Sequence, residues 1–344
     1  MRILYLCNKY YYERKMSRVR FHSMEAISRL VQVDWWGIRW KGYDNKLTVQ
    51  ENINRIGYKP DLIVAYFPLE MKDLKSVNIP KCLRYNEMYD FEWTKKEIIE
   101  SGAELVICHL KNDMTRYQEH FKDKIKFMYI PHCAEKSIFK DYKLPKKISI
   151  LHAGGVKNTS HSLKMKLISF LIKIKSKLKY RKLKYSGYVN RNPYPFRTRL
   201  VMILKNINPK YKYKIFKHPG TDLRKAYTNK YAIKFAKAIN SAKIVLTCSS
   251  IYKYRLAKYT EIPMCATALG ADLPDQDQED FKKFIIELND NMTDNEIIEK
   301  LEYYLEHDDE RQILVEKGLE LSKNFTQEEY AKKFVHEVEI FLRE

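Results

Sequence analysis

Residues 103–132, AELVICHLKNDMTRYQEHFKDKIKFMYIPH, decide the fold of this chain. Residues 103–109 form a short apolar run, which is typical of a buried strand, and residues 125–130 form a second one. Residues 112–120 between them are mostly polar and favour a helix. A strand, a helix and a strand joined in this way make a right-handed crossover unit whose strands pair in parallel. The stretch therefore predicts a parallel sheet with helices packed against it.

The same alternation continues along the 344 residues in two blocks. In the first block, further strands are predicted at 1–6, 31–37, 60–67 and 82–85, and helices at 21–30, 49–57 and 93–101. In the second block, strands are predicted at 148–152, 211–216, 243–248 and 265–269, and helices at 162–177, 227–240, 277–287, 294–307, 308–322 and 326–342. Residues 135–147 carry no strong pattern and are interpreted as a linker.

This pattern predicts the α/β class, with two doubly wound, Rossmann-like domains. We expect the N-terminal domain at 1–143, the C-terminal domain at 148–325, and an amphipathic helix at 326–344 that packs back toward the N-terminal domain. Thr326 with Glu329 three residues later predicts a capping box at the start of that helix. Two such domains face a cleft between the carboxyl ends of their strands, where ligands bind.

Charge is the most unusual property of the composition. The net charge is +21, and residues 148–260 hold 27 lysines and arginines against one acidic residue, Asp222. A field of this size favours an anionic partner, and the open alternatives are nucleotide phosphates, nucleic acid, an anionic lipid surface and an acidic glycan. For residues 161–185, where apolar residues alternate with lysines, the simpler interpretation is a packed helix with a solvated lysine face.

The same composition bears on the cellular compartment. No run of 18 or more uncharged apolar residues occurs, so we expect no membrane span. The N-terminal apolar run is short and soon followed by charges, which fits a buried strand rather than a signal peptide. The six cysteines are scattered without a Cys-x-x-Cys pair, which indicates reduced thiols and no zinc site. We expect a cytoplasmic protein, with a peripheral position at a membrane as the alternative.

The stretch RLAKYTEIPMCATALG, residues 255–270, holds the main candidate site. Arg255, Lys258 and Glu261 are spaced by three residues, which predicts that they lie on one face of a short helix. Cations of this kind can bind a diphosphate, and a carboxylate can accept hydrogen bonds from a ribose diol. The alternative is an ordinary ion pair on a solvated helix.

Two further candidates follow predicted strands of the second block. Gly154 and Gly155 end the first strand, where glycine lets a phosphate approach the backbone closely. His218, in the sequence Lys-His-Pro-Gly, follows the next strand and would face the same cleft. The alternatives are an ordinary strand-to-helix turn for the glycines and a structural turn residue for His218.

Three pieces of the second block resemble known glycosyltransferases. They are ISILHAGG at 148–155, YAIKFAKAINSAKIVL at 231–246 and KYTEIPMCATAL at 258–269. The whole chain resembles glycosyltransferases of the GT-B fold, and its C-terminal half is similar to the spore-maturation-protein group of glycosyltransferase-like proteins, with its donor motif K-Y-x-E-I-P-x-C-x-x-x-L. The N-terminal half matches in architecture alone.

The resemblance implies transfer of a sugar from a nucleotide-diphospho sugar to an acceptor hydroxyl in the interdomain cleft. It implies that Glu261 binds the donor ribose, and that Arg255 and Lys258 neutralise the diphosphate. Gly154, Gly155 and His218 would then make secondary donor contacts. No metal and no cofactor beyond the donor are implied, because protein cations and helix dipoles serve the leaving group in GT-B enzymes.

The chain departs from this family at one position, and the acceptor side is less defined. Many retaining GT-B enzymes carry a second glutamate eight residues before the ribose-binding one, but Lys253 stands there. Retention and inversion therefore both stay open. An inverting enzyme needs a base for the acceptor hydroxyl, and Glu87 and Asp90 after the strand 82–85 are the candidates, with Glu13 in the first loop as another. For each carboxylate the alternative is a solvated loop residue.

Two other functions remain as alternatives. The cationic block 148–260 favours a transferase directed to a polyanion, either nucleic acid bases or an acceptor held in a membrane. Lys253 favours a non-catalytic module that binds nucleotide sugars. Asp275-Gln-Asp277 imitates a metal-binding Asp-x-Asp motif, but its place before a helix in an acidic run fits a solvated turn better.

Overall fold

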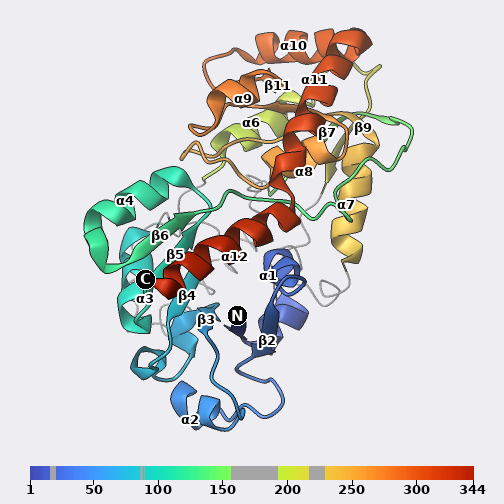
Figure 1. The fold of residues 1–344 in the computed structure, drawn as a ribbon. Helices are drawn as coiled ribbons and strands as arrows, with labels where there is room; N and C mark the ends of the chain where they lie inside the picture. Colours follow the sequence, from blue (N-terminus) through green and yellow to red (C-terminus); the bar gives the residue numbers. More distant parts are fainter. Residues whose placement is uncertain (16–20, 86–87, 89, 156–192, 217–228) are drawn as a thin grey trace, which may run out of the picture.

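The computed structural model describes residues 1–344 except 16–20, 86–87, 89, 156–192 and 217–228. It contains two α/β domains, each built on one parallel sheet (Figure 1). The predicted helix 162–177 and the candidates His218 and Glu87 lie outside the described residues. Of the helices in the described part of the chain, none combines the length and the apolar character needed to cross a membrane.

The N-terminal domain has a six-stranded sheet in the order β2-β1-β3-β4-β5-β6. Its strands are β1 (Arg2–Leu6), β2 (Gln32–Trp36), β3 (Leu62–Ala65), β4 (Lys81–Tyr85), β5 (Leu105–Cys108) and β6 (Lys126–Tyr129). Its helices are α1 (His22–Ile27), α2 (Val49–Asn54), α3 (Phe91–Ser101) and α4 (Lys111–Phe121). All residues of β3 and β5 are buried, because both faces of the sheet are covered.

The C-terminal domain has a five-stranded parallel sheet in the order β11-β10-β9-β7-β8. Its strands are β7 (Ile148–Ala153), β8 (Tyr213–Phe216), β9 (Ala242–Leu246), β10 (Ala268–Ala271) and β11 (Ile285–Glu287). Its helices are α6 (Pro195–Ile203), α7 (Lys230–Asn240), α8 (Lys258–Met264), α9 (Gln278–Lys282), α10 (Asp294–Glu306) and α11 (Asp308–Ser322). In each sheet, the strand that comes first in the sequence lies between the second and the third: β1 lies between β2 and β3, and β7 lies between β8 and β9. The direction in which the strands are added therefore reverses at β1 and at β7.

Within the described residues, the predicted strands and helices are confirmed except in residues 255–269 and 277–287. The helix expected at 277–287 is wrong: α9 ends at Lys282, and Ile286 pairs with Gly270 as part of β11. A three-residue strand gives little sequence signal, and its pairing with β10 overrides the helical pattern. The helix α6 was not predicted, because its sequence lies in a lysine- and arginine-rich run.

The donor segment also differs from the expectation. The helix α8 begins at Lys258, so Arg255 lies in the loop before it and does not share a helix face with Lys258 and Glu261. Ser250 and Lys253 both have positive φ angles, of 75° and 53°, which turn the chain sharply after β9. The helix therefore starts one turn later than the spacing predicted.

The terminal helix α12 (Gln327–Arg343) returns to the N-terminal domain, as expected, and lies beside α1 (Figure 1). Tyr330, Phe334 and Val338 are buried in one core with Phe21 and Met24. Thr326 caps this helix by accepting a hydrogen bond from the Glu329 N–H at 3.2 Å. The core of the N-terminal domain is therefore built from both ends of the described chain.

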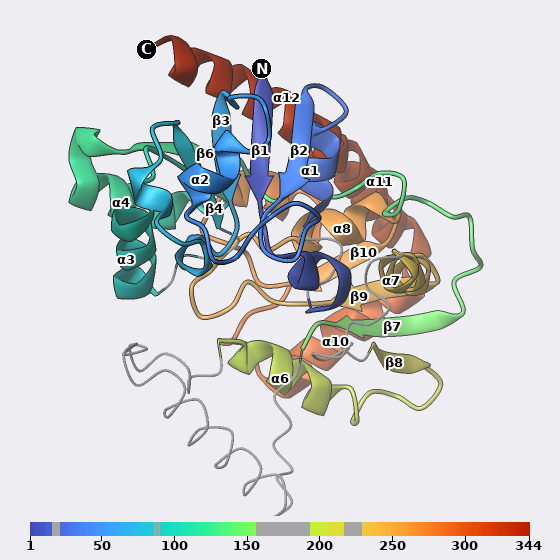
Figure 2. The same ribbon diagram turned by 90° about the horizontal axis from the view of Figure 1, so that it is seen from below.

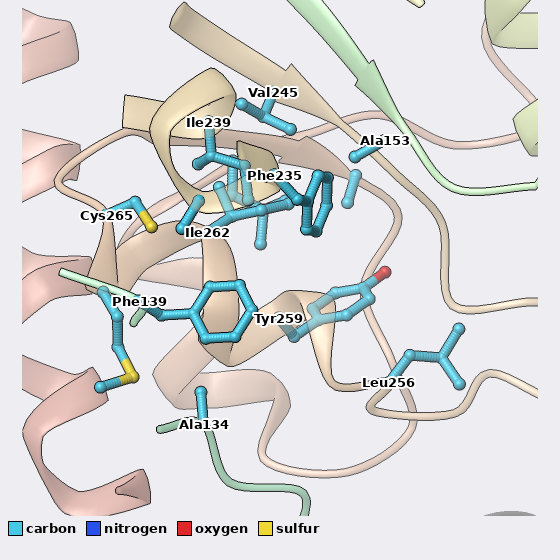
Figure 3. Close-up of a cluster of buried hydrophobic side chains, with 14 of the residues drawn as sticks. Ala134, Phe139, Ala153, Phe235, Ile239, Val245, Leu256, Tyr259, Ile262 and Cys265 are labelled. Carbon is cyan, nitrogen blue, oxygen red and sulfur yellow. The ribbon is translucent and has the colours of Figure 1, made fainter. Parts of the chain in front are cut away.

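The chain crosses between the domains twice, and the two crossings lie side by side. The Ala134 N–H donates to the Phe325 carbonyl at 2.9 Å, and the Gln327 N–H donates to the Ala134 carbonyl at 3.0 Å. Just after the first crossing, Phe139 inserts into the core of the C-terminal domain near Phe235 and Tyr259 (Figure 3). The exact domain boundaries stay a prediction, and the buried cluster around Phe139 also includes Leu110 and Ala134.

Replacing Phe334 with alanine should destabilise the protein by about 3–5 kcal/mol, because the ring is fully buried between α12 and the sheet. Ile340 on the same helix is partly exposed, and Ile340→Ala should cost less than half as much. Urea unfolding followed by circular dichroism measures both. Equal losses would show that α12 does not contribute to the core.

Candidate functional site

The loops at the carboxyl ends of the two sheets contact each other. Asp113, at the start of α4, accepts a hydrogen bond from the Tyr254 hydroxyl at 2.7 Å, and Asn112 donates to Asp275 at 3.1 Å. Tyr254 follows β9 and Asp275 follows β10. The arrowheads of β1 and β2 also point toward the C-terminal domain (Figure 2). Ligands of such sheets bind at these ends, where the strand order reverses.

Glu261 lies on α8 and is only 5% exposed. Within the described residues, no donor lies within hydrogen-bond distance of its carboxylate. Burial raises its pKa above the ordinary value, and the charge of Lys258 partly opposes this. A buried carboxylate without donors is costly, and a ligand with hydroxyl groups would remove that cost.

Two more residues surround the Glu261 carboxylate. Lys258 precedes it on α8 and is half-buried, with its ammonium 5.8 Å from the centre of the Phe235 ring. Tyr231 on α7 has a pKa raised to about 12, first by burial and then by the negative charge of Glu261. The sequence predicted the first of these residues as a site residue but not the second.

Gly154 and Gly155 follow β7, as predicted. Gly154 has a φ angle of 123°, and a Cβ at this position would lie 2.8 Å from a terminal nitrogen of Arg197. Glycine is therefore required here for both backbone conformation and space. Within the part of the chain that the structure describes, no atom lies within 4 Å of the place where a Cβ of Gly155 would be.

Arg197, on α6, is a candidate site residue that the sequence analysis did not name. It is 4% exposed, its Nε has no partner, and one terminal nitrogen donates to the Cys248 carbonyl at 3.3 Å. Within the described residues, no carboxylate lies within ion-pair distance of it. Its guanidinium lies 3.9 Å from the centre of the Tyr194 ring. A buried cation without an acid is typical of an anion-binding site.

No motif could have identified Arg197, because its meeting with Gly154 depends on tertiary packing. The sequence does carry a signal for the start of the helix α6, because Tyr194 is followed by Pro195 and proline is common at the first helical position. This signal predicts the helix, but it does not predict which residues the Arg197 side chain will contact.

Arg255 does not lie with Lys258 and Glu261. It is 1% exposed, and its guanidinium lies 3.8 Å from the centre of the Phe325 ring and 3.2 Å from the Thr260 hydroxyl. Asp277 lies 3.7 Å from another of its nitrogens. These contacts place Arg255 against the second chain crossing, where it joins the donor segment to the connection before α12.

Lys253, which stands where related enzymes carry a second glutamate, pairs with an acid of its own domain. Its ammonium lies 2.9 Å from Asp272 at the end of β10. The buried Asp272 carboxylate also accepts hydrogen bonds from the Ser249 N–H at 2.7 Å and from the Tyr259 hydroxyl at 3.2 Å. The carboxylate at this end of the sheet therefore comes from Asp272 rather than from position 253.

In the N-terminal domain, the candidate Asp90 caps α3 by accepting a hydrogen bond from the Trp93 N–H at 3.2 Å. The same loop is held by Asp113, which accepts a hydrogen bond from the Met88 N–H at 3.1 Å.

Asp275 and Asp277, which imitate a metal-binding motif in the sequence, contact Asn112 and Arg255 respectively. The described residues contain no group of acids, histidines or cysteines that could hold a metal ion.

Comparisons with known proteins support the fold. No protein-family model matches the chain, and no curated protein matches it. Among solved structures, sucrose-phosphate synthase from Thermosynechococcus elongatus matches with a TM-score of 0.61 and 13% identity, covering 100% of this chain and 99% of that one. HepE from Anabaena, in complex with UDP and glucose, matches with a TM-score of 0.59 and 10% identity, covering 98% of this chain and 99% of that one. A glycosyltransferase from Rickettsia africae matches with a TM-score of 0.57 and 14% identity, covering 98% of this chain and 97% of that one.

These likenesses extend over both domains and show the GT-B fold. At 10–14% identity they show the fold alone. The spore-maturation-protein group expected from the sequence does not appear among them and stays a prediction.

Glu261→Gln should stabilise the folded protein at neutral pH. The pKa of Glu261 is raised on folding, so ionisation disfavours the folded state as the pH rises from the ordinary glutamate value. The gain should therefore disappear below about pH 4, where the carboxyl is protonated in both states. Thermal unfolding between pH 4 and pH 8 measures it. Glu299→Gln, at an exposed position on α10, is the control, and an equal gain there would contradict the prediction.

Proposed function

We propose that this chain is a glycosyltransferase that moves a sugar from a nucleotide-diphospho sugar to a hydroxyl of an acceptor. The observation that carries the proposal is a pair of buried charges at the carboxyl end of the C-terminal sheet. Within the described residues, Glu261 has no hydrogen-bond donor and Arg197 has no acid. A nucleotide sugar supplies both partners, because its ribose carries two hydroxyls and its diphosphate is anionic.

In this proposal the donor lies across the end of the C-terminal sheet, where β7 and β9 meet. Glu261 accepts hydrogen bonds from the ribose hydroxyls. Arg197 and Lys258 bind the diphosphate, and Gly154 and Gly155 let it approach the backbone. Arg255 stays a predicted phosphate contact, but its contacts with Phe325 and Thr260 favour a supporting role in this proposal.

The reaction exchanges one carbon–oxygen bond for another. The bond between the sugar and the diphosphate breaks, and the nucleoside diphosphate leaves with its electron pair. A new glycosidic bond forms to the acceptor oxygen, and the acceptor proton passes to a base or to the leaving group. The cations Arg197 and Lys258 stabilise the charge that develops on the leaving diphosphate, which is a main source of catalysis in such sites. No metal or further cofactor is part of this proposal.

The acceptor is proposed to bind on the N-terminal domain, with Glu87 and Asp90 as the candidate bases. Support comes from the position of their loop, which Asp113 joins to the donor segment through Met88 and Tyr254. Both stereochemical outcomes are compatible with the proposal. HepE, which shares the fold, is in complex with UDP-glucose in one structure, and this supports a nucleotide sugar as the donor here.

The polyanion-directed and non-catalytic alternatives stay predictions. Fourteen of the 27 basic residues in 148–260 lie outside the described residues, so the structure leaves about half of this basic block undescribed. The cytoplasmic location is likewise proposed from the sequence alone. The oligomeric state is not part of the proposal.

Arg197→Met should weaken binding of UDP, or of whichever nucleoside diphosphate binds, by about 10- to 100-fold. The reason is the loss of a charge-assisted hydrogen bond, which contributes about 1.5–3 kcal/mol. Calorimetric titration with UDP, GDP, TDP and their glucose conjugates measures this. Glu261→Ala should weaken nucleosides as well, because it removes a ribose contact.

Arg199, two residues away on α6, provides a matched control. It is half-exposed, pairs with Asp294 at 2.7 Å and donates to the carbonyls of residues 290 and 292. Arg199→Met should leave nucleotide affinity within about twofold of the wild type. Equal losses for both arginines, or no binding of any nucleotide by the wild-type protein, would refute the proposal.

A further inference from the structure

A second point of strand reversal lies in the N-terminal domain, between β1 and β3. The chain leaves β1 into Asn8 and the short helix η1 (Tyr11–Lys15), and it leaves β3 into Phe67 and the 3-10 helix η3 (Pro68–Glu70). Sheets of this kind bind ligands outside the carboxyl ends of their strands at such a point. The proposed donor occupies the equivalent point of the other sheet, so this one has no ligand assigned to it.

A carboxylate is held at this position by neutral donors. Glu70 is exposed, and it accepts hydrogen bonds from the Asn8 amide at 3.3 Å and from the Tyr11 hydroxyl. Within the described residues, no cation lies within ion-pair distance of it. An ionised carboxylate has about four acceptor positions, of which these bonds use two. Glu70 is therefore oriented by two donors, and it can accept further hydrogen bonds from a ligand.

Aromatic rings adjoin this carboxylate. The ring centres of Tyr11 and Phe67 are 4.8 Å apart, those of Tyr66 and Phe67 are 4.5 Å apart, and those of Tyr10 and Tyr11 are 6.2 Å apart. Tyr10 is 39% exposed. An aromatic face next to hydrogen-bond acceptors suits a sugar ring, which has apolar C–H faces and hydroxyls around its edge.

The backbone between β3 and Glu70 is strained. Phe67 has φ 57° and ψ 65°, in the left-handed region that a bulky aromatic residue rarely adopts. Such conformations are found mainly where function requires a particular direction of the chain. Here the turn at Phe67 brings its ring against Tyr11 and directs the next residues so that Glu70 meets Asn8.

We propose that this position binds the acceptor, and that the acceptor is a neutral carbohydrate. Glu70 accepts hydrogen bonds from its hydroxyls, and the rings of Tyr10, Tyr11 and Phe67 cover one of its apolar faces. A negative charge at the contact disfavours an acidic glycan, nucleic acid or a lipid phosphate. The inference rests on the proposed function, because it names the acceptor for the same reaction.

Saturation-transfer NMR with neutral saccharides tests this in the presence of saturating UDP. The probes are glucose, galactose, maltose, cellobiose and lactose, with sialic acid and anionic phospholipid vesicles for comparison. We expect binding of at least one neutral saccharide, and we expect Glu70→Gln to weaken it about tenfold or more while the UDP affinity is unchanged. Tyr11→Phe keeps the ring and should cause a smaller loss.

Glu119→Gln, at an exposed position on α4 of the same domain, is the matched control and should bind saccharide as the wild type does. If UDP binds but no neutral saccharide does, if the vesicles or sialic acid bind instead, or if the two glutamate variants behave alike, the inference is overturned and the proposed function stands. A wild-type protein that binds no nucleotide overturns both. Loss of UDP binding in Glu70→Gln would also contradict an acceptor position for this residue.

Discussion

The hydrogen bond between the Tyr254 hydroxyl and Asp113 joins the two halves of the molecule at the carboxyl ends of both sheets. Both side chains are buried, and the other oxygen of the same carboxylate accepts the Met88 N–H. One acid thus holds the loop before α3, the start of α4 and the segment after β9. The burial of this carboxylate raises its pKa, and the hydrogen bonds from Tyr254 and Met88 oppose that rise. The loops at the carboxyl ends of the two sheets are therefore joined through this carboxylate as well as through the hydrogen bond from Asn112 to Asp275.

Around that centre the protein retains charges that do not help it to fold. Arg197 and Glu261 are both buried without an ion-pair partner in the described part of the chain, and Phe67 keeps a strained backbone. The cores of the two domains must offset these costs. Buried charges without partners and strained backbone are common in the binding sites of enzymes, where polar groups are held in position before the ligand arrives and the ligand completes their hydrogen bonds.

Much of this could be predicted from the sequence, and the reasons for the failures are physical. Strands such as β3 and β5 are buried on both faces, so their apolar runs are continuous and easy to recognise. β11 is only three residues long, and its pairing with β10 decides its conformation. Lys258 and Glu261 do share the helix α8, as their spacing predicted, but Arg255 was wrongly placed on that helix. Arg197 and Glu70 were not among the predicted candidates, because their partners are distant in sequence and meet them only after folding.

The return of α12 to the N-terminal domain has a consequence for synthesis on the ribosome. Residues 1–130 emerge first, but their core stays incomplete until residues 330–338 have been translated, after the entire C-terminal domain. The core of the N-terminal domain is therefore completed only after the C-terminal domain has been translated. While translation continues, the surface of α1 that α12 will cover, including Phe21 and Met24, is exposed and must be protected from aggregation.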